Sequence, residues 1–187
     1  MRANRRAKPQ SAHMDLSPAS RTAMTLPAPL SLIVGAIAVA LLLNLLPWSG
    51  WPLRARPGFM LVVLLYWAVH EPHKIGQGCG FMLGLVMDVT DSVLLGQHAA
   101  VYVAALFCVQ LLRLRVLQLT VFEQALHIGA ILLAAQTIAI LLNLSLGRNF
   151  PGAAMLLAPV LGALLWPAVN FFATLPRFRR RFGRLIS

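Results

Sequence analysis

The chain has 187 residues, of which 59% are hydrophobic and only 11% are charged, whereas a soluble globular domain carries about 25% charged residues. This shortage of charge excludes an ordinary water-soluble protein, and the length allows one domain. Sixteen Lys/Arg against five Asp/Glu give a net charge of +11, and much of the basic excess lies near the two ends of the chain.

The first 29 residues are polar, basic and proline-containing, and we expect them to form a mostly disordered cytoplasmic tail. Their basic residues are Arg2, Arg5, Arg6, Lys8 and Arg21. Residues 177–187 form a second basic tail with Arg177, Arg179, Arg180, Arg181 and Arg184. Beside long apolar segments, such basic runs follow the positive-inside rule rather than the pattern of a nucleic-acid-binding module. We therefore expect both tails to contact anionic lipid headgroups and not to bind nucleic acid.

Six apolar segments between the tails predict an all-α membrane protein, with a bundle of six transmembrane helices over residues 30–176. The segments are approximately 30–46, 58–69, 75–89, 94–112, 125–146 and 153–175. A cleaved signal peptide is not expected, because the polar lead is long and the first segment ends in Pro47 and tryptophan. Cys79 and Cys108 lie inside apolar segments, so no disulfide framework is expected.

The second and third segments are short, since a helix needs about 20 apolar residues to cross the hydrocarbon core. A merged span would leave the basic C-terminus outside and bury Glu71 and Lys74. A re-entrant hairpin keeps the number of crossings even, and so keeps both basic tails on the same side, but it also buries this polar turn in the membrane. Two short spans with a cytoplasmic turn satisfy both constraints, and we expect them to sit among other helices or in thinned lipid. This topology predicts a multi-pass inner-membrane protein with both termini in the cytoplasm.

Small residues recur every four positions in the third segment. Gly76, Gly80 and Gly84 lie on one helical ridge, and Asp88 continues the same spacing. Such spacing allows a second helix to approach closely. The second helix is either another span of this chain or a helix of a partner protein, and both alternatives stay open. In either case a bulky residue at Gly80 or Gly84 should impair assembly.

Several polar residues near or inside the apolar segments are further candidate functional positions. Asp88 and Asp91 either form a polar turn or contact a cation or a partner, and without nearby His or Cys ligands they predict no metal site. His98 and His127, at the starts of the fourth and fifth segments, are better interpreted as interfacial hydrogen-bonding groups than as a proton relay. Amide side chains expected to bond across helices are Gln136, Asn143 and Asn170.

Catalytic signatures are missing from the sequence. There is no HExxH motif, no nucleophile with a matching His context and no phosphate-binding loop, so the chain is not expected to be an enzyme or to hold a cofactor. The stretch GQGCG at residues 76–80 lacks a preceding strand and a following Lys, and is typical of helix packing instead.

Residues 56–102, RPGFMLVVLLYWAVHEPHKIGQGCGFMLGLVMDVTDSVLLGQHAAVY, resemble the proteobacterial form of the MreD family of rod shape-determining membrane proteins. The ordered motifs HxPHKxG, GFxLGLxMD and LLGQH, followed by a Tyr, carry the likeness. QALH at 124–127, FPG at 150–152 and ALLWP at 163–167 agree with it, so the resemblance extends over most of the chain. One departure is Gly58, where many members carry an Asp.

The resemblance implies a non-enzymatic component of the bacterial cell-elongation machinery. Members of the family associate with MreC, and with it they support the RodA glycosyltransferase and its penicillin-binding transpeptidase alongside MreB filaments. The resemblance also implies a six-helix fold similar to the substrate-binding subunits of energy-coupling-factor transporters, although a shared fold does not determine function.

Two hypotheses of different classes follow. In the first, the chain is a scaffold or regulator that binds MreC through the Gly76/Gly80/Gly84 ridge and the two short spans, and so supports lateral peptidoglycan synthesis and rod shape. In the alternative, it is a transporter-like module that binds a small or lipid-derived ligand in its helical bundle. The alternative requires several polar groups that converge on one cavity, whereas the amides and carboxylates are scattered along the sequence.

Overall fold

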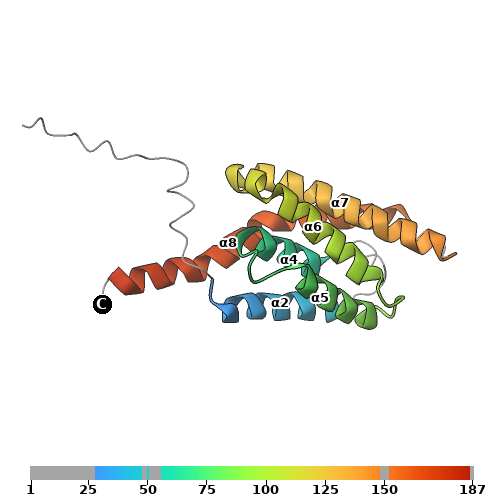
Figure 1. Ribbon diagram of the computed structural model, residues 1–187, viewed down its shortest axis with the longest axis horizontal. Coiled ribbons are helices and arrows are strands. Elements are labelled where there is room, and N and C mark those ends of the chain that lie inside the picture. Colours follow the sequence, from blue (N-terminus) through green and yellow to red (C-terminus); the bar gives the residue numbers. More distant parts are fainter. Residues whose placement is uncertain (1–27, 48–49, 51–55, 148–151, 186–187) are drawn as a thin grey trace, which may run out of the picture.

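The computed structural model describes residues 28–47, 50, 56–147 and 152–185, and these are helical without any strand. The α-helices, in chain order, are α2 (Leu30–Leu45), α4 (Phe59–His70), α5 (Gln77–Thr90), α6 (Gln97–Gln118), α7 (Val121–Ser145) and α8 (Leu157–Leu185). A short 3-10 helix, η1 (Ala153–Leu156), precedes α8. Each of the six expected apolar segments corresponds to one of these α-helices, packed side by side in a bundle (Figure 1). The all-α class is therefore confirmed, while six membrane crossings stay a prediction.

Helix ends differ most from the expected ones at α8. The sequence predicts an end at residue 175, before Pro176 and the arginine cluster, but the helix continues to Leu185. Figure 1 shows this last part of α8 extending beyond the other helices. A proline removes one backbone hydrogen bond, and a helix can continue through it when the bend is tolerated. The arginine cluster marks the end of the apolar part of α8 rather than the end of the helix.

The short helix α4 forms the centre of the bundle. Nine of its 12 residues are buried, including Tyr66 and Trp67, and it packs against α2, α6 and α8. At about 1.5 Å per residue it is only about 18 Å long, well below the roughly 30 Å of a hydrocarbon core. Because other helices surround α4, its length need not match the bilayer. This placement agrees with a short segment that sits among other helices.

An aromatic cluster joins α4 to α7 and α8. The ring of Tyr66 stacks on His70 at 4.2 Å between centroids and lies 5.7 Å from Trp166. The indole nitrogen of Trp166 donates a hydrogen bond of 3.2 Å to the side-chain oxygen of Gln124. Gln124 is 8% exposed, so this bond supplies a hydrogen-bond partner for a buried amide at the start of α7.

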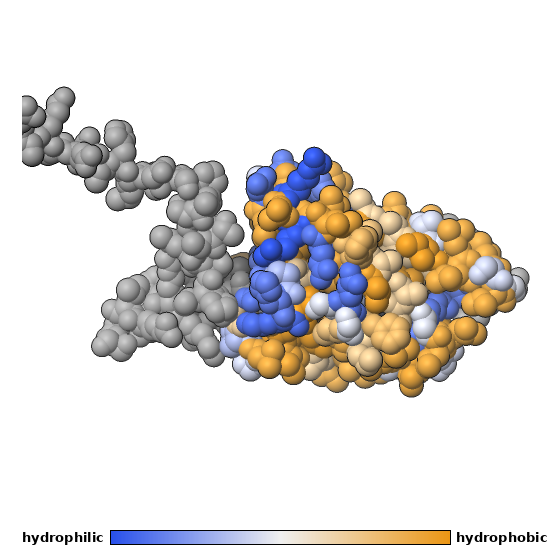
Figure 2. Space-filling view, in the orientation of Figure 1, coloured by the Kyte–Doolittle hydropathy of each residue, from blue (hydrophilic) through white to orange (hydrophobic). Residues whose placement is uncertain are grey.

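The outer surface of the bundle is strongly apolar. Large side chains such as Leu111, Leu126 and Leu164 are 70% or more exposed, which is typical of a surface that contacts hydrocarbon or a partner rather than water. Figure 2 shows hydrophobic residues over most of the visible face, with hydrophilic ones gathered at the left end. Among the described helices, α6 and α7 are long and apolar enough to cross a membrane, and α2, α4 and residues Leu157–Ala173 of α8 are shorter apolar helices.

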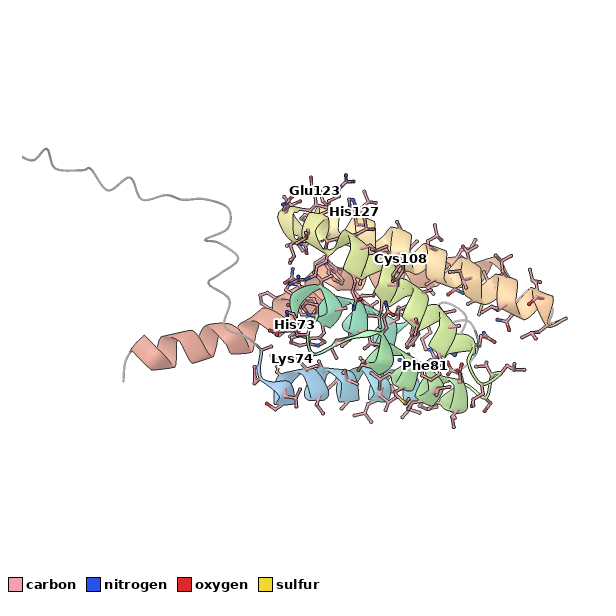
Figure 3. All side chains as sticks on the ribbon, in the orientation of Figure 1. His73, Lys74, Phe81, Cys108, Glu123 and His127 are labelled. Carbon is pink, nitrogen blue, oxygen red and sulfur yellow. The ribbon has the colours of Figure 1, made fainter. Side chains whose placement is uncertain are left out.

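The turn between α4 and α5 marks one end of the bundle, which we call the turn end (residues 71–76). In Figure 3, His73 and Lys74 of this turn lie at the same end as Glu123 and His127 at the start of α7. The turn also holds the start of α2, because the backbone N–H of Ala28 donates to Glu71 Oε1 at 2.6 Å and Lys74 Nζ donates to the Ala28 carbonyl at 2.5 Å. The hydrophilic end of Figure 2 is this turn end.

Candidate functional site

The glycine ridge of α5 packs against α6 of the same chain. A methyl carbon added at Gly84 would meet the α-carbon of Ala99 and lie 2.6 Å from its backbone nitrogen, and one at Gly80 would collide with the side chain of Leu106. Both glycines are buried. Their lack of a side chain is what allows α5 and α6 to approach so closely.

Gly76 does not take part in this contact. It is the N-cap of α5, and an added methyl carbon would have nothing within 4 Å among the described residues. Of the two alternatives for the ridge, the structure thus places α6 of the same chain at Gly80 and Gly84. These positions are not a free surface in this fold, and we do not retain them as the contact for a partner protein.

Asp88 continues the ridge and fixes the start of α6. Its carboxylate is completely buried and accepts hydrogen bonds from the backbone N–H groups of Gly96 and His98, both at 2.7 Å. Gly96 has φ +100°, a left-handed conformation that favours glycine. The carboxylate thereby satisfies free N–H groups at a helix N-terminus, where the helix dipole also stabilises a negative charge.

A chain of charged groups extends from Asp88 towards α2. The imidazole Nδ1 of His98 lies 3.0 Å from Asp88 Oδ1, and its Nε2 lies 3.6 Å from Asp91 Oδ2. Arg56 Nη2 donates to both carboxylate oxygens of Asp91 at 3.0 Å, and Nη1 donates to the backbone carbonyl of Asn44 at 2.7 Å. The side chains of Arg56 and Asp91 are 16% and 25% exposed, so water still reaches this ion pair. This charged chain ties the end of α2, the segment before α4, the end of α5 and the start of α6 together.

A cavity of about 490 Å³ opens beside this charged chain, at the end of the bundle opposite to the turn end; we call it the cavity end. Its volume lies within the 300–1,000 Å³ of typical ligand pockets. Four of the polar positions expected from the sequence line it: Asp91, His98, Gln136 and Asn143. Asp88 lies directly behind His98. The groups that look scattered along the sequence therefore converge on one cavity.

The other expected positions lie elsewhere. Asn170, on α8, is not among the described residues that line the cavity. Gly80 and Gly84 lie at the contact between α5 and α6 described above, and Gly76 is the last residue of the turn end. His127, although also a histidine near the start of a helix, is at the turn end, where its Nδ1 lies 2.9 Å from the carbonyl of Glu123.

Four polar residues that line the cavity were not predicted from the sequence: Asn44, Arg56, Gln97 and Tyr102. Arg56 could have been predicted, because the expected topology places both Arg56 and Asp91 on the outer side of the membrane. Opposite charges on the same side can pair there. Asn44 had no such signal, since it follows a run of apolar residues and its burial depends on how α2 lies against α4. Gly58, where many members of the resembled family carry an Asp, also lines the cavity.

The cavity combines an apolar wall with a few polar side chains. Among the described residues no group of three or more His, Cys, Asp or Glu side chains is placed to hold a metal ion. Apolar side chains including Leu61, Val101, Leu132 and Ile140 form the rest of the wall. A cavity with an apolar wall and a few placed polar groups is the usual form of a small-molecule site.

Comparison with known proteins identifies the family. The family model for rod shape-determining protein MreD matches residues 27–175. The rod shape-determining protein MreD of Haemophilus influenzae is 28% identical over 149 residues, which cover 80% of this chain and 91% of that protein. No solved structure gives a significant match, so the expected similarity to the substrate-binding subunits of energy-coupling-factor transporters stays a prediction.

Proposed function

Because the chain belongs to the MreD family of rod shape-determining proteins, we propose that it is a non-enzymatic scaffold of the cell-elongation machinery that binds MreC in the bacterial inner membrane. The single observation behind this proposal is the family match over residues 27–175. Membership in the family makes the chain a membrane protein with a role in rod shape. In the proposal, binding to MreC links it to RodA, its penicillin-binding transpeptidase and MreB, and so to lateral peptidoglycan synthesis.

The proposed topology places the turn end in the cytoplasm and the cavity end on the periplasmic side. Lys74 of the turn, Arg113, Arg115 and the arginines at the end of α8 then all lie on the cytoplasmic side, as the positive-inside rule requires. The contact of Lys74 and Glu71 with Ala28 holds the start of α2 at the turn end, the end at which these basic residues lie.

The outer face of α5 is our proposed contact for the membrane helix of MreC. Phe81, Met82, Val86 and Val89 are between 41% and 67% exposed on this face, and α6 is the main neighbour of α5 within the bundle. With 14 residues, α5 is about 21 Å long, so lipid must thin to match it. A partner helix on this face would relieve that mismatch.

Replacing both Met82 and Val86 with tryptophan is expected to abolish the co-purification of MreC, because two bulky rings would hold a partner helix away from α5. The variant should still fold, since both side chains already point away from the core. The matched control places tryptophan at Leu133 and Leu141, which are exposed apolar residues of α7. This control should retain MreC. Affinity purification from detergent-solubilised membranes measures both variants, and unchanged MreC recovery with the α5 variant would reject this surface.

We also retain the second hypothesis, a module that binds a small or lipid-derived ligand, because the cavity now favours it. The polar groups of four helices and of the segment before α4 converge on one space with an apolar wall. This arrangement supports ligand binding within a scaffold protein as well as in a transporter-like module. Native mass spectrometry of the purified chain tests it, and a reproducible bound small molecule is the expected result.

A further inference from the structure

Two buried amide groups in the cavity have no partner for one of their polar atoms. Asn44 is 5% exposed and Gln97 is 9% exposed, and both line the cavity. Neither Asn44 Nδ2 nor Gln97 Oε1 has a hydrogen-bond partner among the described residues. Buried polar groups are almost always paired, because leaving them without a partner is unfavourable. Two residues in the wall of the cavity therefore hold a donor and an acceptor that no described residue satisfies.

The charged groups beside these amides already have partners. Arg56 is bonded to Asp91 and to the Asn44 carbonyl, while Asp88 is bonded to His98 and to backbone N–H groups. Two carboxylates face one guanidinium and one imidazole here, so the cluster has no surplus positive charge. An anionic headgroup would meet this cluster without a free cation to pair with. The unused groups thus favour an uncharged ligand.

Hydroxyl groups match both amides at once. An amide oxygen needs a donor and an amide nitrogen needs an acceptor, and a hydroxyl serves as either. The apolar wall, formed by residues such as Leu61, Val101, Leu132 and Ile140, suits a hydrocarbon chain rather than a free sugar or polyol. A ligand with both parts would satisfy the amides and cover the apolar wall.

We propose that the cavity binds the uncharged, hydroxylated headgroup of an amphiphile through Asn44 and Gln97, with the hydrocarbon chain against the apolar wall. This inference rests on the second proposed function and names its ligand class. In the proposed topology the cavity end lies on the periplasmic side, so the amphiphile comes from the outer leaflet of the inner membrane.

Four probes distinguish binding through the hydroxyl groups, the charge and the hydrocarbon chain. Three of them each differ from the first, monooleoylglycerol, in one of these features. The full chain in phosphatidylcholine nanodiscs is tested with monooleoylglycerol, with lysophosphatidic acid carrying the same chain, with methyl oleate and with free glycerol. Thermal unfolding and native mass spectrometry report binding. Monooleoylglycerol should raise the unfolding temperature and appear as a bound species. Its affinity should be at least about tenfold higher than that of each of the other three probes.

Two variants connect this binding to the amides. Asn44→Leu with Gln97→Met removes the unused polar atoms at similar volume, so without ligand it should unfold at the same or a higher temperature than the wild-type chain. It should also lose at least about tenfold in monooleoylglycerol affinity. The matched control is Gln124→Met, which removes an equally buried amide that is bonded to Trp166. The control should lower the unfolding temperature and leave ligand binding unchanged.

The outcomes that overturn the inference differ from those that overturn ligand binding itself. Equal or tighter binding of lysophosphatidic acid, or of free glycerol, would overturn the uncharged amphiphile while leaving a ligand site in place. Unchanged monooleoylglycerol affinity in the double variant would overturn the role of the two amides. Binding of none of the four probes would overturn both this inference and the second proposed function.

Discussion

Replacing Gly84 with leucine is expected to destabilise the folded chain by about 3 kcal/mol, at the upper end of the range for overpacked cores. The added side chain would meet the backbone of Ala99 and His98, and a backbone cannot move aside as a flexible side chain can. The helices α5 and α6 would have to separate, which would also pull Asp88 away from the start of α6. Thermal unfolding of the purified protein, followed by tryptophan fluorescence, measures the change.

A control for this variant lies on the same helix. Gly78 is exposed and an added methyl carbon there has nothing within 4 Å among the described residues, so Gly78→Leu should unfold close to the wild-type temperature. Gly80→Leu should fall between the two, because the obstacle at Gly80 is the end of the Leu106 side chain. Equal stability of the Gly84 and Gly78 variants would show that α5 and α6 do not pack through the glycine ridge.

Replacing Asp88 with alanine is the second change with a large expected effect, a loss of about 3 kcal/mol of stability. The substitution leaves the N–H groups of Gly96 and His98 without their buried acceptor, and each buried unpaired group costs about 1–3 kcal/mol. Asp88→Asn should lose less, because its side-chain oxygen can still accept one of these bonds. Chemical or thermal unfolding of the purified variants measures the order.

Asp91 provides the comparison for Asp88. It is 25% exposed at its side chain and pairs with Arg56, and a partly exposed ion pair contributes only about 0–1 kcal/mol. Asp91→Asn should therefore unfold near the wild-type temperature. If Asp91→Asn proved as damaging as Asp88→Ala, the stabilising contact would be the ion pair with Arg56 and not the capped start of α6.

The helices could be predicted because each is an apolar run bounded by polar residues, proline or glycine. The end of α8 could not, since the arginines that end its apolar part do not end its helical hydrogen bonding. The short length of residues 58–69 correctly indicates that this segment differs from the others. That it lies at the centre of the bundle became clear only from its packing against α2, α6 and α8.

The cavity could be predicted only in part. Asp91, His98, Gln136 and Asn143 stand out because polar side chains are expensive within apolar segments. Nothing in their spacing indicates that α7 turns its two amides towards the ends of α5 and α2. Convergence of this kind depends on helix tilt and rotation, which are set by packing between helices rather than by local sequence. For the same reason, the sequence alone does not indicate which helix packs against Gly80 and Gly84; in the structure it is α6.

Cell shape is the most direct measurement of the central claim, that the chain determines rod shape by binding MreC through α5. Cells of the source bacterium depleted of this protein would be supplied with the wild-type chain, the Met82 and Val86 double tryptophan variant or the Leu133 and Leu141 control, at matched levels in the membrane. The account predicts rods with the wild-type chain and the control, and round cells with the α5 variant. Normal rods with the α5 variant, or round cells with the wild-type chain, would contradict it.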